Sequence, residues 1–575
     1  MNMKYTKVLG LALAALTFCT CSDEWDNHYN TQQVGDGRSL WETISTDNTL
    51  SNFASVIQAT GYDKALGSSQ VFTVFAPTND ALTAEQAEEW IDVYNQELAD
   101  NKKDEDNKTI KEFVKNHITL YNKSVSELSN DTIVMLNGKY LKLDADGLDG
   151  HNLSLKNSHH TNGILFKVDH QVDYFYNVFE YLATDADLDS LAKFLYSYNE
   201  YEFMPELSVP GGIENGQTVY LDSVTVLENE LFARIGLINE EDSTYTMLAP
   251  TNQVWSKLVE EYENYFNYCD FVQGRDSLKH LNTRLAVVRG TVFSHTANKN
   301  WADSAVSVNA VPYNMRKYMY GSADAAYYVY YNTMAADGIF NGAIEKECSN
   351  GRVMKADTWN IDKTQSFLQN VIMEGEARNS QAKVDEVKTV TPLQSTYVAS
   401  THPFYNKISN NGFTEIVPTA ANARPQVWFY IDNVLSNLAY DIQLVLVPTW
   451  TGDLTSAGVA ETVKPNFMSV KLWSLKQDAV DNSIENEENW NVEQMLRNYE
   501  TNFLREGVDT TYITMDTITV ASNYTFPTCS YGLETPQVML EIQGLGIAAL
   551  KKYQGNIRVD AIILKPHEEE NSVVE

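Results

Sequence analysis

The sequence predicts a multidomain α+β protein in which two related α+β modules precede an all-β domain of the sandwich or jelly-roll type. Three observations support this prediction. A chain of 575 residues is too long for a single hydrophobic core. A motif of strand, proline and helix start occurs twice, at 72–82 and at 245–255. From about residue 361, long alternating strands separated by turn residues replace the mixed pattern.

Composition limits the partners and the cofactors. The formal net charge of −35 argues against nucleic acid, which proteins hold mainly through Lys and Arg. The 33 Tyr and 10 Trp either fill cores and sheet faces or include platforms that stack on sugars. No CxxC pair or His/Cys cluster is present, so neither a metal nor another cofactor is expected. Cys269 and Cys348 either form one disulfide or remain free buried thiols.

The N-terminus has the pattern of an export signal. Lys4 and Lys7 precede the apolar run 8–18, which is too short to span a bilayer. The run ends in LTFCTC followed by SDEWD, which resembles a bacterial lipoprotein signal. The resemblance implies that 1–20 is a signal peptide and that Cys21 carries the lipid, with Cys19 as the alternative. Residues 21–37 resemble the acidic surface-export tag and tether of Bacteroidota lipoproteins; a periplasm-facing or a simply secreted protein is the alternative.

The first module is expected over residues 38–175. Apolar residues at helical spacing fill 40–59, and a strand over 72–76 is stopped by a proline. A charged helix is predicted over 84–98, and Asn137-Gly138 predicts a hairpin with a type I′ turn between strands 132–136 and 140–143. A strand over 162–169 closes the module.

The second module, expected over 176–360, is a diverged copy of the first. Three segments recur in the same order: 41–47 at 179–185, 73–79 at 246–252, and 162–169 at 350–357. The spacing between the first two segments is larger in the second copy, which predicts an insertion near 200–240. Because this insertion contains Pro210-Gly211-Gly212 and Asn215-Gly216, it is expected to form a long loop or an extra hairpin.

The paired motifs FTVFAPTNDAL and YTMLAPTNQVW resemble the signature of the fasciclin-like domain, an extracellular adhesion module. The resemblance implies two tandem fasciclin-like domains. His117 stands where that family often has a Tyr-His pair linked to adhesion, but Asn116 precedes it here. A buried histidine bonded to the backbone is therefore the alternative interpretation of His117. The corresponding segment of the second module, 285–290, contains no histidine.

The C-terminal domain is expected over 361–575. Strands are predicted over 427–431, 440–447, 538–542 and 556–564, and the acidic, Asn-rich segment 477–500 is predicted to be a large loop with helical turns over 492–499. This layout resembles the sandwich domains of Bacteroidota surface lipoproteins, some of which bind glycans.

Two sets of candidate site residues follow. The candidates for ligand contact are one histidine and several aromatic residues, with core packing as the alternative for each: His117, Tyr327, Tyr328, Tyr330, Tyr331, Trp450, Trp473 and Trp490. A tripeptide of Asp, Ser or Thr, and an apolar residue resembles the short O-glycosylation signal of exported Bacteroidota proteins, although so short a pattern also has many chance matches. It occurs around Thr132, Ser190, Ser223, Ser277, Ser304 and Thr517.

No catalytic motif is found: GxSxG, HExxH and phosphate-binding glycine loops are absent from the sequence. No acidic cluster in an apolar setting stands out either, so binding rather than catalysis is expected. The resemblances together imply a lipid-anchored protein on the outer surface of the outer membrane. It would be an accessory subunit of a Sus-type glycan importer, with a barrel transporter and its lid lipoprotein as partners. The alternatives are adhesion to host matrix or neighbouring cells, and a hydrolase in the C-terminal domain.

Overall fold

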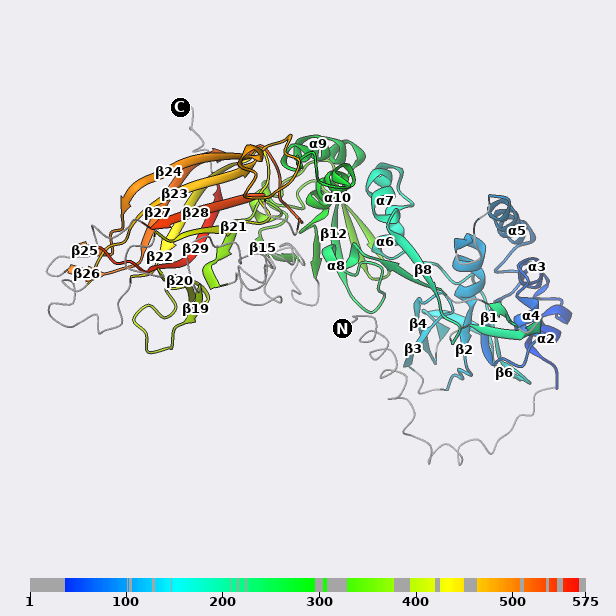
Figure 1. Ribbon diagram of the computed structural model, residues 1–575. Coiled ribbons are helices and arrows are strands. Elements are labelled where there is room, and N and C mark those ends of the chain that lie inside the picture. Colours follow the sequence, from blue (N-terminus) through cyan, green and yellow to red (C-terminus); the bar gives the residue numbers. More distant parts are fainter. Residues whose placement is uncertain are drawn as a thin grey trace. The chain divides into compact units, whose positions relative to one another are not determined.

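The computed structural model describes residues 37–567 with gaps (Figure 1). The gaps fall at 101, 103–105, 127–129, 146, 207, 215–216, 223–224, 295–303, 308–327, 377–392, 419–423, 449–462, 507–510, 534–536 and 545–551. The predicted signal peptide, Cys21 and the tether up to residue 36 lie outside the described residues. Within the described part, no helix is long and apolar enough to cross a membrane. The chain forms two compact units, residues up to 175 with 200–228, and residues 176–199 with 229 onward.

The first unit places helices on one face of a sheet and hairpins on the other. Its sheet has the order β2-β1-β7-β6-β5-β4-β3. The strands are β1 (Phe72–Pro77), β2 (Ile118–Leu120), β3 (Asn130–Val134), β4 (Tyr140–Asp144), β5 (Gly147–Leu148), β6 (His151–His160) and β7 (Gly163–Val168). The helices are α2 (Leu40–Thr46), α3 (Ser51–Ala59), α4 (Asp63–Leu66) and α5 (Ala84–Ala99). Phe72 and Val74 pack with the helices, whereas Phe75 and Phe166 pack with the hairpins, because side chains alternate along a strand.

Local sequence explains where these elements begin and turn. The charged helix predicted over 84–98 is confirmed as α5, and Thr83 and Gln86 form a capping box at its start. The hairpin at Asn137-Gly138 is also confirmed. Its turn type was predicted wrongly, because only Gly138 has a positive φ, of 85°, whereas a type I′ turn needs a positive φ at both residues. Instead, the Gly138 N–H donates to the Met135 carbonyl at 2.9 Å.

The insertion forms strands rather than a loop. β8 (Asn199–Phe203) pairs with β11 (Thr225–Asn229), and β9 (Val209–Glu214) pairs with β10 (Gln217–Asp222) as a hairpin. Residues 200–228 pack as part of the first unit, although the sequence continues from them into the second module. One contact that holds them is the hydrogen bond from the Tyr201 hydroxyl to Asp106, at 2.9 Å.

The second unit begins with a sheet that repeats the strand arrangement of the first. Its order is β15-β14-β13-β12-β17-β16. β12 runs parallel to β17 and antiparallel to β13, just as β1 runs parallel to β7 and antiparallel to β2. The strands are β12 (Tyr245–Pro250), β13 (Val292–Ser294), β14 (Ser304–Ser307), β15 (Tyr328–Tyr331), β16 (Ile344–Cys348) and β17 (Gly351–Ala356). The helices are α6 (Val178–Leu182), α7 (Asp189–Tyr196), α8 (Phe232–Ile235), α9 (Asn252–Tyr262) and α10 (Arg275–Val288).

The repetition extends to individual side chains. Asn162 accepts from the Leu40 N–H at 2.8 Å and donates to the carbonyls of residues 66 and 68. Asn350 accepts from the Val178 N–H at 2.8 Å and donates to the carbonyls of residues 238 and 240. Each asparagine therefore ties the first helix of its module to the segment before its central strand. The sequence repeat reflects a repeated set of buried hydrogen bonds.

Replacing Asn350 with alanine is expected to lower the free energy of unfolding of the second unit by about 2 to 4 kcal/mol. The change leaves one buried N–H and two carbonyls without their partner. Denaturant unfolding of the full chain measures the effect. Asn341→Ala is the control, because Asn341 is exposed and its side chain donates only to the Ala336 carbonyl among the described residues. Equal stability of the two variants would contradict the structural role of Asn350.

The rest of the second unit is all-β, as predicted. One sheet has the order β19-β20-β29-β22-β27, with β18 also pairing with β29, and a second has the order β21-β28-β23-β24. The strands are β18 (Val371–Glu374), β19 (Gln394–Tyr397), β20 (Gly412–Ile416), β21 (Gln426–Tyr430), β22 (Ala439–Leu446), β23 (Phe467–Leu475), β24 (Trp490–Glu500), β25 (Leu504–Glu506), β26 (Thr511–Ile513), β27 (Asp516–Thr525), β28 (Val538–Gly544) and β29 (Ile557–Pro566).

The prediction of a loop with helical turns over 477–500 was wrong at its C-terminal half. Residues 490–500 form β24, which pairs with β23 along its whole length. β24 is the last strand of its sheet, and most of its side chains are exposed or half-buried. An edge strand exposed in this way accepts polar residues, so it lacks the apolar alternation by which strands are recognised.

A segment of the second module packs into the C-terminal region. Cys269 lies fully buried in a cluster with Trp428, Trp473 and Trp490. The Asp270 N–H donates to the Gln477 carbonyl at 2.9 Å. Cys269 and Cys348 are both free thiols, which excludes the disulfide between them; the alternative of free buried thiols holds for Cys269, whereas Cys348 is half-buried.

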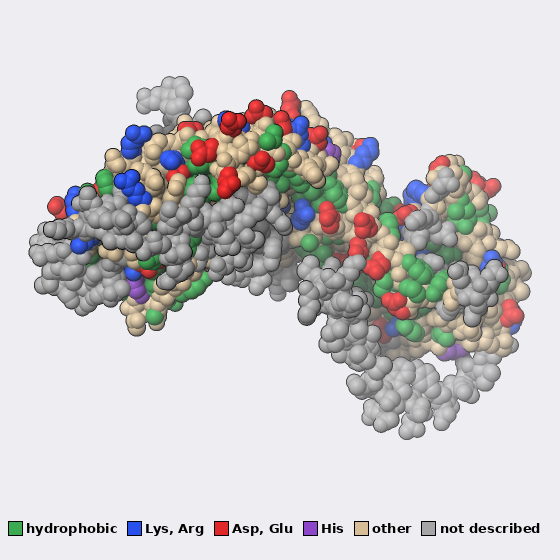
Figure 2. Space-filling model, viewed as in Figure 1, with side chains coloured by type: hydrophobic (Ala, Val, Ile, Leu, Met, Phe, Trp, Pro, Cys, Tyr) green, Lys and Arg blue, Asp and Glu red, His purple; other side chains and the backbone are tan. Residues whose placement is uncertain are grey.

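The described surface reflects the acidic composition of the chain. Figure 2 shows Asp and Glu side chains spread over the visible face, with Lys and Arg in small groups between them.

Candidate functional site

The structure places His117 inside the first unit. Its side chain is 0% exposed, and its Nδ1 donates to the Phe113 carbonyl at 2.7 Å while its Nε2 accepts from the Val172 N–H at 3.1 Å. Burial lowers the pKa of His117 to about 4, so the ring is neutral at pH 7. The prediction of ligand contact by His117 was therefore wrong, and the alternative, a buried histidine hydrogen-bonded to the backbone, is confirmed.

The predicted tryptophans are core residues where they are described. Trp473 and Trp490 are each 3% exposed, and their rings meet edge to face at 6.0 Å. Trp473 also donates through Nε1 to Glu541 at 2.7 Å. The prediction that either ring stacks on a sugar was therefore wrong, and the alternative, packing in the core, is confirmed for both. Trp450 lies outside the described residues.

The tyrosines and the glycosylation candidates do not gather into one site. Tyr330 is 6% exposed and packs against Phe293, which corrects its assignment to ligand contact, whereas Tyr331 is 73% exposed. Tyr327 and the side chain of Tyr328 are outside the described part. Among the glycosylation candidates, Thr132, Ser277 and Thr517 are exposed, Ser190 and Ser304 are half-buried, and Ser223 is not described.

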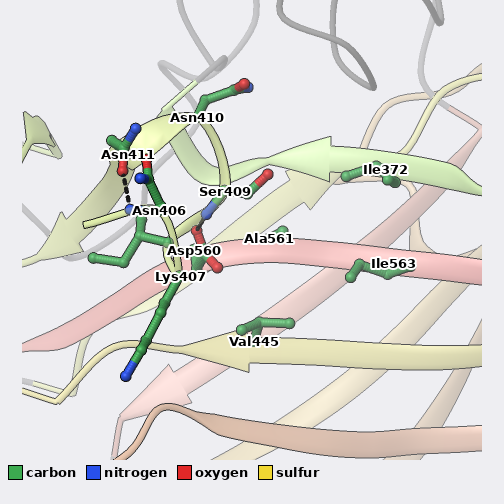
Figure 3. A pocket seen from close by; sticks show the side chains of 11 residues that line it. Ile372, Asn406, Lys407, Ser409, Asn410, Asn411, Val445, Asp560, Ala561 and Ile563 are labelled. Atoms are coloured by element: carbon green, nitrogen blue, oxygen red, sulfur yellow. Dashed lines mark hydrogen bonds between the residues drawn. The ribbon is translucent and has the colours of Figure 1, made fainter. Parts of the chain in front are cut away.

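The structure instead presents a cavity on the C-terminal region that sequence reasoning missed. It has a volume of about 500 Å³. Its floor consists of apolar side chains from β18, β22 and β29, and its wall is the loop 406–411 (Figure 3). The floor residues are Ile372, Val445, Ala561 and Ile563. An open concavity with an apolar floor and a few polar groups is the usual form of a small-molecule site.

Strand register explains why these side chains meet. Ile372 lies opposite Ile563, and both Glu374 and Val445 lie opposite Ala561. Residues directly opposite each other share one face of a sheet, so Glu374 lies on the face that forms the cavity floor. Asp560 is the extra residue of a β-bulge, because Ala561 pairs with Val445 while Val559 pairs with Leu446. Bulges redirect a side chain, and Asp560 lines the cavity.

Three asparagines shape the loop that forms the wall. Asn406, Asn410 and Asn411 have positive φ angles of 62°, 47° and 55°. Asparagine tolerates this left-handed conformation better than most residues. The side chain of Asn411 accepts from the Asn406 N–H at 2.6 Å and closes the loop on itself. The loop therefore presents amide groups and Lys407 around the cavity.

Three carboxyl groups are buried behind this wall. Glu374, Glu376 and Asp560 are 1%, 5% and 3% exposed. Ser409 joins two of them, because its N–H donates to Asp560 at 3.0 Å and its hydroxyl donates to Glu374 at 2.7 Å. Burial raises the pKa of Glu374 to about 7 and that of Asp560 to about 8, and it raises the pKa of Glu376 as well.

This cluster corrects the expectation that no acidic cluster lies in an apolar setting. Asp560 is far in sequence from Glu374 and Glu376, and it meets them through the pairing of β18 with β29. The sequence did contain a signal for these buried acids. Glu374 ends the apolar run VIME, and Asp560 interrupts the apolar strand IRVDAIIL. A lone carboxylate in a buried strand is rare unless it is paired. Within the described residues, no group of three or more His, Cys, Asp or Glu is arranged to hold a metal ion.

Comparisons with known proteins identify one domain. A family model for the fasciclin domain matches residues 48–172, which makes this part of the chain a domain of the binding and adhesion type. No curated protein matches the chain.

Several solved structures are also similar. A FAS1 domain pair from the insect cell adhesion molecule fasciclin I has 12% identity over 55% of this chain and 98% of its own, with a TM-score of 0.18. The catalytic domain of a GH87 alpha-1,3-glucanase, in complex with nigerose, has 10% identity over 36% of this chain and 30% of its own, with a TM-score of 0.18. A carbohydrate-binding module studied for mannan recognition has 10% identity over 35% of this chain and 99% of its own, with a TM-score of 0.17. At these TM-scores the structural similarities carry no functional argument.

Proposed function

We propose that this protein is a lipid-anchored binding protein of the outer cell surface that captures glycan as an accessory subunit of a Sus-type uptake complex. The observation that carries the glycan part is the cavity of the C-terminal region. Its apolar floor can pack against the face of a sugar ring, and the amides of Asn406, Asn410 and Asn411 can hydrogen-bond sugar hydroxyls. The fasciclin domain at 48–172 supports a binding role in general.

The proposed location rests on the N-terminal sequence. Cys21, after the apolar run and before an acidic stretch, is the residue we propose to be lipidated. The partners proposed are the barrel transporter and its lid lipoprotein. Two fasciclin-like domains in tandem, the second inferred from the repeated strand pairing of β12, would serve as the spacer or the contact surface toward them.

Affinity purification tests this proposal directly. The tagged full-length protein is purified from outer membranes in mild detergent, and co-purifying proteins are identified by mass spectrometry. We expect stoichiometric recovery with a barrel transporter and its lid lipoprotein. Cys21→Ser is the matched control: it is expected to leave the membrane fraction and to lose both partners. Recovery of the protein alone would contradict the importer role and favour adhesion to matrix or to other cells, which the fasciclin domain also supports.

The buried carboxyl groups favour a second candidate function, hydrolysis in the C-terminal region. Glycosidases use two carboxyl groups with different pKa values. We expect no turnover, because Glu374 is 1% exposed and does not line the cavity, so Asp560 is the only one of the two carboxyl groups that reaches it. A screen of oligosaccharide and peptide substrates decides between the two functions, and turnover that disappears in Asp560→Asn would establish catalysis.

A further inference from the structure

We propose that the cavity selects glycans that carry a free amino group, and that Asp560 receives the ammonium of the ligand with Glu374 and Glu376 behind it. This inference rests on the proposed function, because it names the chemical class of the captured glycan. Figure 3 shows Asp560 between the loop that carries Ser409 and the strand that carries Ala561, at the wall of the cavity.

The first observation that points to a ligand is the unmet demand for hydrogen bonds. Among the described residues, Glu374 Oε2 and Glu376 Oε2 have no hydrogen-bond partner, although both residues are at least nine-tenths buried. Glu374 lies on the face of β18 that carries Ile372, and it accepts from the hydroxyl of Ser409, a residue that lines the cavity, so it lies directly behind the wall. Buried polar atoms normally have a partner, and an exception in a native protein indicates a missing water, ion or ligand.

The second observation is that no described cation offsets these acids. Lys407 lies with its Nζ 5.9 Å from the ring centre of Phe404, and in Figure 3 it extends away from Asp560. Arg558 is bonded to Glu415 and to the Pro448 carbonyl. His402, which lies just before the loop 406–411, has its pKa lowered by burial and by Arg558. The charges that face the cluster from β20, β29 and the loop are therefore committed elsewhere or turned away.

An ammonium group fits this environment better than a neutral hydroxyl. An uncompensated buried carboxylate is costly, and a hydrogen-bonded cation is the partner that removes most of that cost. The ammonium offers three donors, enough for Asp560 and for an oxygen that now lacks a partner. When it binds to a protonated carboxyl, the carboxyl proton leaves to solvent and the carboxylate pairs with the ammonium, so charge and protons balance. Binding is therefore expected to release protons near neutral pH.

Calorimetry with two matched oligosaccharides tests the inference. The full-length protein in mild detergent is titrated with a glucosamine oligomer and, separately, with the N-acetylglucosamine oligomer of equal length. We expect the amino oligomer to bind at least about tenfold more tightly, and Asp560→Asn to remove that preference. The affinity for the amino oligomer is also expected to rise between pH 6 and pH 7 and to fall with added salt.

Control variants separate this inference from the proposed function. Asp441→Asn makes the same change on β22, in a residue that does not line the cavity and pairs with His567, and should leave the affinity unchanged. Thermal melting verifies that Asp560→Asn folds. Equal affinity for both oligomers, or an Asp560→Asn variant that keeps the preference, would overturn the ammonium site while leaving glycan capture intact. If a lysine peptide binds and the amino oligomer does not, the ligand is not a glycan. If neither binds, the inference itself is overturned. The importer role is tested separately, by the affinity purification described above.

Discussion

Replacing Glu541 with alanine is expected to lower the free energy of unfolding of the second unit by about 3 kcal/mol. Glu541 is 0% exposed and lies in the middle of β28. It accepts hydrogen bonds from Trp473 Nε1 at 2.7 Å, from Gln426 Nε2 at 2.6 Å and from Lys471 Nζ at 3.2 Å. Removing the carboxylate takes an acceptor from the buried indole N–H of Trp473 and from the Gln426 amide, and it leaves the partly exposed Lys471 without its counter-charge.

Tryptophan fluorescence during denaturant unfolding measures this effect, because Trp473 lies in the cluster with Trp428 and Trp490. Glu541→Gln is expected to lose less, since the amide oxygen still accepts from Trp473. Glu493→Ala is the control, because Glu493 is exposed on β24 and bonds only to the Tyr524 hydroxyl among the described residues. It should change the stability by less than about 1 kcal/mol. A Glu541→Ala variant as stable as the control would show that the network does not stabilise the sheet.

The elements that were predicted correctly are those set by local sequence. The repeat was visible because Asn162 and Asn350 each sit beside a glycine whose φ, 151° and 142°, is rarely adopted by other residues. In each case a β-carbon would lie within 2 Å of a carbonyl on the neighbouring strand. Such a pair of residues is conspicuous at any position in a sequence. The helix α5 was visible for a similar reason, since its cap and its period lie within one continuous segment.

The candidate site was missed because no local pattern specifies it. The cavity depends on the register of β18, β22 and β29, and on a single bulge at Asp560. Strand order in a sheet of this kind cannot be read from alternation, since every strand presents the same period. Aromatic residues were chosen instead because they are chemically suited to sugars, but Trp473 and Trp490 serve the core. The more informative signal was a carboxylate inside an apolar strand, which is costly unless something compensates it.

The buried carboxyl groups lead to the second large effect, a loss of stability as pH rises. The pKa of Glu374 is about 7 in the folded chain and that of Asp560 is about 8, against ordinary values of 4.5 and 3.8. Between these limits the folded state holds protons that the unfolded state has released. The free energy of unfolding therefore falls as pH rises from about 4, and the loss is complete only above the folded pKa values.

For Glu374 alone the shift corresponds to a loss on the order of 3 kcal/mol across this range, since one pKa unit corresponds to about 1.4 kcal/mol. Glu374→Gln removes the titrating group but keeps an oxygen for the Ser409 hydroxyl. We expect its stability to exceed that of the parent chain at about pH 8 and to match it more closely at about pH 5. Denaturant unfolding of both proteins at several pH values gives the difference between their free energies of unfolding. Titrations of other groups, such as His117, occur in both proteins and cancel in this difference.

The sign of that difference is what distinguishes a buried acid that holds its proton from one that is paired. A carboxylate stabilised by an unseen cation would have a lowered pKa, and Glu374→Gln would then destabilise the chain most strongly at high pH. Glu493→Gln, at an exposed position on β24, is the control for the substitution itself. If an amino-sugar ligand occupies the cavity, its addition should raise the stability of the parent chain at about pH 8. The same ligand should have a weaker effect on Glu374→Gln, because the negative charge behind Asp560 is then reduced.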